Sequence, residues 1–304
     1  MIKSFTVTNH IGESLELILA EPEKSGLAII NAEGLGQVEA DVNLTDLADS
    51  DYTSVNSIRL QKRNVVFDIL YYGDDIESCR HTCYRYFPVK KLITLVAKTD
   101  KRELMLTGFV EKNTPNIFSE TSGCQVSILC PDPFWYSTEE TVIPFGGIEP
   151  KFEFPFPEGI TDSEGWDTFE VGNIRIIKEK SIYYTGEAEV GFTIDINATG
   201  TVRDLVFYDV NQMEQLSIDD EVLASITGGT SIKSGDRIII TTMRRQKKAV
   251  LVREGSIYNI INALGRDRSW FELDTGDNLY AYSASEGEFE LDINIKYRNL
   301  YKGL

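Results

Sequence analysis

Histidine is scarce in this chain, since His10 and His81 are the only two among 304 residues. Histidine is the most frequent general base in enzymes and the commonest metal ligand, so little is left for either role. The nucleophile-elbow, phosphate-loop and dinucleotide-binding motifs are absent as well. The sequence therefore predicts a protein that is not an enzyme and that has no catalytic, cofactor-binding or metal site.

Cysteine is also sparse, and the four cysteines lie among apolar residues. This spacing predicts reduced core thiols and not a disulfide framework. The segment Cys79-Arg80-His81-Thr82-Cys83 has the composition of a metal cluster. On a helix, however, residues two apart point about 200° away from each other, so we expect His81 to face away from both thiols.

Long apolar runs and an excess of basic residues are both missing. No stretch approaches the roughly 18 apolar residues that a membrane span needs, and the N-terminus alternates like a strand, so we expect neither membrane insertion nor export by a signal peptide. The chain has 30 basic and 48 acidic residues, which gives a net charge of −18. Such a charge repels a phosphate backbone and argues against specific nucleic-acid binding.

What dominates the sequence is alternation of apolar and polar residues, which is typical of half-buried antiparallel strands. A chain of this length favours two domains. We place the boundary after Cys130-Pro131-Asp132-Pro133-Phe134-Trp135-Tyr136, because two prolines stop any regular element there. The prediction is a mainly β protein with domains at 1–140 and 141–304. Phe134, Trp135 and Tyr136 are candidates for burial at a seam between domains or between subunits.

Only two segments have helical spacing, residues 74–87 and Ser256–Leu264. Residues 34–64 contain few large apolar residues and predict a long hairpin or extended arm. Arms of this kind commonly mediate assembly because their edges must be covered. Val38 and Val42 are its candidate interface residues.

Several segments together resemble the distal tail protein family of long, non-contractile-tailed bacteriophages. They are Tyr84–Lys91, Gly123–Tyr136, Trp270–Leu273, Gly276–Tyr282 and Tyr297–Leu304. The resemblance implies an N-terminal β-sandwich with one helix and a projecting β-hairpin, followed by a C-terminal galectin-like β-sandwich.

The family resemblance also implies a function. The chain would be a virion component at the distal end of the tail, assembled in the host cytoplasm as a hexameric ring. Its partners would be other copies of itself, the tail tube protein, the tail-associated tip protein and a receptor-binding protein. DNA would pass through the central channel without specific binding. Acidic residues could line such a channel, and Glu33, Glu39 and Asp41 are candidates.

One alternative from a different class stays open. Exposed aromatic residues can stack on sugars, so the C-terminal domain could be a carbohydrate-binding module for host adhesion. Trp166 and Trp270 are its candidate stacking residues.

Overall fold

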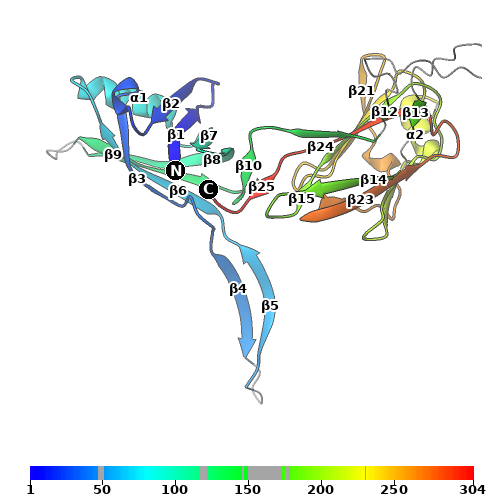
Figure 1. Ribbon diagram of the computed structural model, residues 1–304, viewed down its shortest axis with the longest axis horizontal. Coiled ribbons are helices and arrows are strands. Elements are labelled where there is room, and N and C mark those ends of the chain that lie inside the picture. The colour runs from blue at the N-terminus through cyan, green and yellow to red at the C-terminus, as the bar shows by residue number, and fades with distance from the viewer. Residues whose placement is uncertain (47–50, 117–121, 146, 150–172, 176–178, 230) are drawn as a thin grey trace, which may run out of the picture. The chain divides into compact units, whose positions relative to one another are not determined.

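The chain forms two compact units, as a computed structural model shows (Figure 1). The structure describes residues 1–46, 51–116, 122–145, 147–149, 173–175, 179–229 and 231–304. Unit 1 contains Met1–Glu139 and Asn299–Leu304, and unit 2 contains Glu140–Arg298. The sequence division assigned all of 141–304 to one domain, whereas the chain in fact returns to unit 1 for its last residues.

Unit 1 is built on an antiparallel sheet in the order β2-β1-β7-β8-β9-β6-β3. Alternate residues of these strands are buried, so that one face of the sheet carries the core, as the period of two predicts. Two short strands, β10 and β25, pair with each other, and β10 also pairs with β8. The bounds are β1 Ile2–Thr8, β2 Ser14–Ile18, β3 Leu27–Glu33, β6 Arg63–Tyr71, β7 Leu92–Thr99, β8 Glu103–Asn116, β9 Gly123–Cys130, β10 Trp135–Ser137 and β25 Leu300–Tyr301.

One α-helix, α1, and one short 3-10 helix, η1 (Pro22–Lys24), complete the compact part of unit 1 within its described residues. The helix α1 spans Ile76–Tyr86, inside the range expected from the sequence. The Asp75 side chain caps its N-terminus by accepting a hydrogen bond from the Ser78 amide at 3.0 Å. The helix ends before Phe87 because the following Pro88 disfavours helical geometry.

Unit 2 contains a six-stranded sheet, β11-β24-β16-β19-β20-β21, and a four-stranded sheet, β14-β23-β17-β18. Aromatic pairs fill its core, including Phe192 with Tyr280 at 5.2 Å between ring centroids. Two further strand pairs are β12 with β13 and β15 with β22. The bounds are β11 Thr141–Pro144, β12 Gly147–Glu149, β13 Asn173–Arg175, β14 Glu179–Tyr184, β15 Val190–Gly191, β16 Thr193–Ala198, β17 Val206–Asp209, β18 Glu214–Ser217, β19 Arg237–Thr241, β20 Lys248–Arg253, β21 Ser256–Asn259, β22 Glu272–Leu273, β23 Gly276–Ser283 and β24 Leu291–Tyr297.

The helix predicted at Ser256–Leu264 is wrong. Its first half is strand β21, and its second half contains only the 3-10 turn η2 (Ile261–Ala263). The reason is the tight turn at Glu254-Gly255, where both residues have positive φ and fold β21 back onto β20. A helix that the sequence reading missed, α2, spans Asp220–Thr227 and has both an Asp219 N-cap and a left-handed Gly228 after its end.

A carboxylate with two cationic partners lies on the outer face of the six-stranded sheet. The Asp195 side chain is almost buried and accepts hydrogen bonds from Arg237 Nε at 2.8 Å and Nη2 at 2.7 Å. Lys296 Nζ donates to the same carboxylate at 2.6 Å. The Arg237 hydrogen bonds, followed by that of Lys296, lower the pKa of Asp195 to about 2.

We predict that Asp195→Asn lowers the free energy of unfolding of unit 2 by about 2 kcal/mol at pH 7. A depressed carboxyl pKa stabilises the fold above the unfolded pKa, and this contribution is lost as the pH falls through the folded pKa. The difference between wild type and variant should therefore shrink from about pH 4 down to about pH 2. Urea unfolding across this range, with the exposed Asp292→Asn as control, measures it. A difference that stayed constant down to pH 2 would refute the ion-pair account.

Candidate functional site

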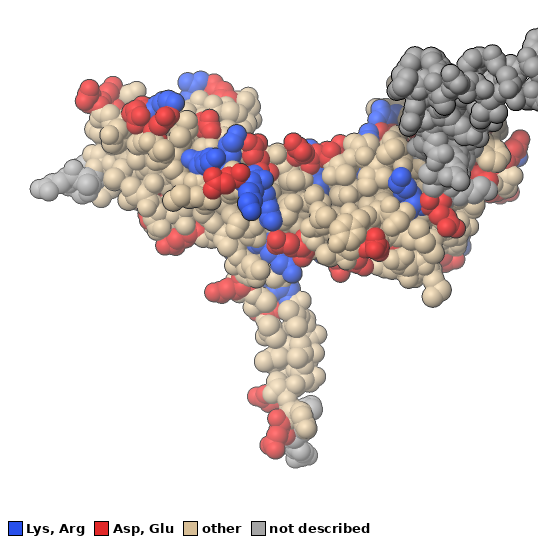
Figure 2. Space-filling view, in the orientation of Figure 1, with Lys and Arg blue, Asp and Glu red and all other residues tan. Residues whose placement is uncertain are grey.

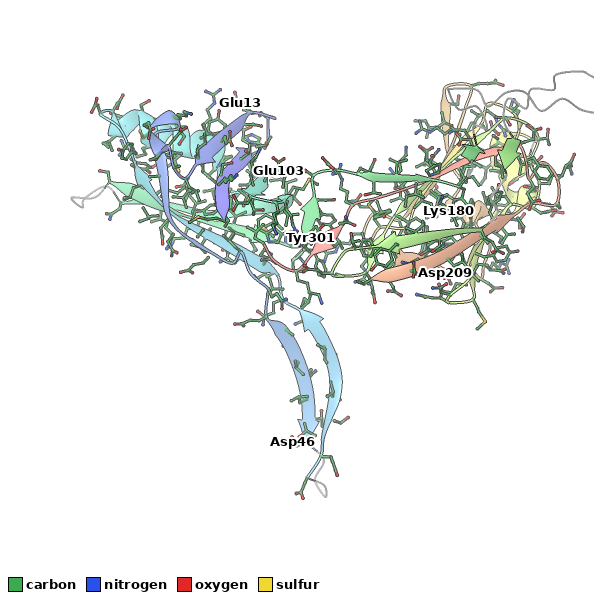
Figure 3. All side chains as sticks on the ribbon, in the orientation of Figure 1. Glu13, Asp46, Glu103, Lys180, Asp209 and Tyr301 are labelled. Carbon is green, nitrogen blue, oxygen red and sulfur yellow. The ribbon has the colours of Figure 1, made fainter. Side chains whose placement is uncertain are left out.

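A long two-stranded ribbon leaves the sheet of unit 1 between β3 and β6 (Figure 1). Its strands are β4 (Ala40–Asp46) and β5 (Thr53–Leu60), and in the described residues they pair only with each other. We call this ribbon the arm. Asp46 lies near its far end (Figure 3). A two-stranded hairpin has too little core to be stable by itself, so the arm depends on its anchor and on whatever covers it.

One face of the arm is apolar. Opposed residues of antiparallel strands share a face, and the register pairs Val42 with Ile58 and Leu44 with Val55. Val55 and Ile58 are three residues apart and would point to opposite faces of a regular strand. A register shift between Asn43 and Leu44 brings them to the same face. The apolar face consists of Val42, Leu44, Val55, Ile58 and Leu60, all of which are 43–66% exposed.

The opposite face of the arm is polar and makes hydrogen bonds within itself. Arg59 donates to Asp41 from Nε at 2.9 Å and Nη2 at 2.7 Å, and Asn56 donates to Thr45 at 2.6 Å. Along the middle of the arm Figure 2 shows few charged side chains, whereas acidic ones gather at its tip. The arm thus has one face whose polar groups find partners and one face whose apolar side chains remain in water.

Arg63, the first residue of β6, anchors the base of the arm. Its side chain is fully buried, and among the described residues its hydrogen bonds go to backbone carbonyls. Burial lowers the pKa of this guanidinium. The Arg63 guanidinium carbon also lies 5.7 Å from the centre of the Trp135 ring. Its four hydrogen bonds run from Nε to Pro133 O at 2.7 Å, from Nη1 to Gly34 O and Gly36 O at 2.5 Å each, and from Nη2 to Lys302 O at 2.7 Å.

These contacts join three segments that are distant in sequence: the start of the arm, the proline-rich turn before β10, and the C-terminal tail. Only a guanidinium can do so, because it presents five donors in fixed, divergent directions. Gly34 is required as well. It has a φ of +76°, and a Cβ there would lie 1.9 Å from the Asn64 carbonyl oxygen. The Leu304 amide adds a hydrogen bond to Leu35 O at 3.1 Å.

The structure separates the predicted interface residues. Trp135 is fully buried beside Arg63, where it packs in the core of unit 1. Phe134 and Tyr136 are half-buried, and the Tyr136 hydroxyl donates to Asp132 at 2.5 Å. Val38 is half-buried near the arm base, and Val42 belongs to the exposed apolar face.

The sequence reading missed Arg63, although one signal pointed to it. Buried residues of β6 fall on the odd positions Val65, Phe67 and Ile69, and Arg63 has the same parity. An arginine at a core position of a strand predicts a buried guanidinium that needs several acceptors.

A second exposed apolar patch crosses the outer face of the unit 1 sheet. The register aligns Leu92 with Phe109 and Phe109 with Leu129, on three adjacent strands. Leu92 and Phe109 are exposed and Leu129 is half-buried. We call this row the sheet stripe. Three exposed lysines that we call the flanking lysines lie on the segments beside it: Lys90, Lys91 and Lys112.

The candidate saccharide residues give no assembled site. Trp270 is half-buried, and Lys247 Nζ lies 5.3 Å from the centre of its ring, over one of the two faces that a sugar could use. Trp166 lies outside the described residues. Within the part of the chain that the structure describes, there is no cluster of metal-ligating side chains and no helix long and apolar enough to span a bilayer.

Comparisons with known proteins identify the architecture. No protein-family model and no curated protein sequence matches the chain significantly. The Dit protein (gp 19.1) of phage SPP1, described as a paradigm of the hub adsorption apparatus in phages that infect Gram-positive bacteria, aligns with a TM-score of 0.63 and 14% identity. The alignment covers 97% of this chain and 99% of that chain.

The chain thus has a Dit-like fold. The baseplate of phage P2 in its activated conformation with calcium contains a chain that also matches, with a TM-score of 0.52, 12% identity, and coverage of 97% of this chain and 98% of that chain. The sequence resemblance to this family and the mainly β prediction are confirmed in the architecture. At these identities the likeness concerns the Dit-like fold alone.

We predict that Arg63→Met lowers the free energy of unfolding of unit 1 by about 3 kcal/mol or more, because it removes the four hydrogen bonds that this buried side chain donates to backbone carbonyls. Arg59→Met is the matched control. Arg59 is 79% exposed, and losing its ion pair with Asp41 should cost less than about 1 kcal/mol. Denaturant unfolding measures both variants, and hydrogen exchange at Gly34–Gly36 should accelerate only in the first. Equal losses in the two variants would contradict the anchor role.

Proposed function

We propose that the chain is a structural hub protein at the distal end of a long, non-contractile bacteriophage tail. Two observations support this role: the Dit-like fold, which extends over nearly the whole of both aligned chains, and an arm whose apolar face is 43–66% exposed in the described part of the chain. The second observation carries the proposal, because a surface built to be covered by another molecule implies assembly.

The arm is one half of a subunit interface. Its five apolar side chains are each about half exposed, so covering one contributes roughly 1 kcal/mol. A head-to-tail interface requires two different, complementary patches on each copy, and it is repeated until the ring closes. The burial free energy of each arm is modest, but every interface of the closed ring contributes the same amount again.

The sheet stripe is the other half of this interface. Both patches are apolar and narrow, and their charges are of opposite sign. The flanking lysines lie beside the stripe, whereas the arm carries the exposed acidic residues Asp46 and Asp51 near its tip. In a chain with a net charge of −18, such a group of lysines favours contact with an acidic segment over contact with the average surface.

The assembled form is a ring of six copies around a central channel. The tail tube protein lies on one side, the tail-associated tip protein on the other, and a receptor-binding protein at the periphery. DNA passes through without specific binding, since carboxylates repel its phosphates. Glu33 and Glu39 are exposed and can face the channel, whereas Asp41 is engaged by Arg59. The ring is assembled in the host cytoplasm and functions in the virion.

The carbohydrate-binding alternative rests on aromatic residues alone. Trp270 contacts Lys247 and is half-buried, so no described residue favours a sugar site over the assembly role. A glycan array with the full chain tests it. Specific binding that Trp270→Ala abolishes would support the adhesion function.

We predict that Ile58→Asp weakens self-association at least about tenfold per contact, because the change removes apolar area and buries a charge. Ile58 is 66% exposed in the single chain, so the variant should fold normally. Concentration-dependent sedimentation velocity measures the effect.

Ser57→Asp is the matched control for this experiment. It places the same charge on the neighbouring residue of β5, on the polar face of the arm. It should associate like the wild type. If both substitutions weakened association equally, general charge repulsion and not the apolar face would be responsible.

A further inference from the structure

Two of the four thiols of this chain lie against each other in the core of unit 1. Cys83 Sγ and Cys124 Sγ are 3.2 Å apart, and their residues are 0% and 6% exposed. Cys83 lies in the middle of α1, and Cys124 lies near the start of β9 on the core face of the sheet. The pair therefore connects the helix to a central strand across 41 residues of chain.

The other two thiols have different surroundings. Cys79 Sγ is 3.8 Å from Tyr72 O, and Cys130 Sγ is 3.8 Å from Ile128 O. The sulfur–sulfur contact of this chain is the one between Cys83 and Cys124. Only Cys83 and Cys124 are thus placed to react with each other.

We propose that Cys83 and Cys124 form an oxidative cross-linking site, which is reduced when the chain folds and becomes a disulfide when it meets a small disulfide oxidant such as oxidised glutathione. The inference rests on the core geometry of unit 1 and is independent of the hub role.

The distance already approaches what a disulfide needs. Closing the gap to the roughly 2.05 Å of an S–S bond takes a sulfur displacement of about 1 Å, which side-chain rotation and small helix shifts can supply. By contrast, thiols on separate faces or distant strands would require the sheet to rearrange.

The surroundings keep the pair reduced until an oxidant reaches it. The hydrogen bond with Cys124, together with burial, raises the pKa of the Cys83 thiol. A protonated, buried thiol reacts slowly, because the thiolate is the nucleophile. Reaction therefore requires local opening of α1, whose only fully buried residue is Cys83.

The reaction is a pair of thiol–disulfide exchanges. Cys124, the more accessible thiol, loses its proton and attacks the oxidant. A protein–glutathione disulfide forms, the oxidant S–S bond breaks, and the first glutathione leaves as a thiol. Cys83 then attacks Cys124 Sγ, and the second glutathione leaves. Two electrons pass from the protein to the oxidant, and the two protein protons end on the two glutathione molecules.

The consequence is a covalent tie between α1 and β9. It closes a loop of about 40 residues, which mainly constrains the unfolded chain. The cross-linked form should melt about 5 °C or more above the reduced form. Oxidising surroundings would thus raise the thermal stability of unit 1 without changing its fold.

The test is oxidation of the folded, full-length wild-type protein with oxidised glutathione, followed by intact-mass measurement and non-reducing peptide mapping. We expect a loss of 2 Da, a fall from four free thiols to two, and a single linked peptide pair that contains residues 83 and 124. The melting temperature should rise, and dithiothreitol should reverse the change.

Two variants make the result specific. Cys130→Ser should still form the cross-link, whereas Cys83→Ser should not and should leave Cys124 carrying at most one glutathione. The proposal is overturned if four thiols persist under native conditions, if the linked pair involves Cys79 or Cys130, or if the bond forms only after unfolding in urea. The wild-type mapping decides the question even if a variant fails to fold.

Discussion

The buried guanidinium of Arg63 is the interaction on which the arrangement of unit 1 depends. It holds the carbonyls of Gly34, Pro133 and Lys302, which come from segments far apart in the sequence. A buried cation is costly unless its donors find acceptors, and here backbone carbonyls accept from four of the five. The arm, the turn before β10 and the C-terminal tail are therefore fixed relative to one another by a single side chain.

The two-faced arm follows from this anchor. Because its base is held rigidly, the arm can extend from the sheet with its apolar face uncovered. Val42 and Ile58 remain largely in water, whereas Asp41 and Arg59 satisfy each other on the opposite face. Covering an apolar surface of this kind lowers the free energy, and in the proposed ring the next copy covers it.

Much of the fold could be predicted from the sequence because a period of two is a local property. Alternation marked β6 and β24 correctly, and the long hairpin expected within residues 34–64 is present as the arm, although the five large apolar residues of one arm face were not anticipated. Turn geometry was harder. The segment at Ser256–Leu264 has helical spacing, but the Glu254-Gly255 turn pairs its first half with β20.

The candidate site was less accessible to sequence reasoning. The parity of Arg63 on β6 marks it as buried, but the sequence does not reveal its acceptors, because its contacts with Gly34, Pro133 and Lys302 span 29, 70 and 239 residues. The common face of Val55 and Ile58 likewise depends on a shift in register that no local pattern encodes. Long-range convergence and strand register are properties of the folded chain, so they had to come from the structure.

Electron microscopy of the purified full-length protein tests the central claim most directly. Our account predicts closed particles whose class averages have six-fold symmetry, with the arm of each copy covered by its neighbour. Particles that remain single chains at high concentration, or that associate into open filaments, would contradict a self-closing ring built from the arm and the sheet stripe.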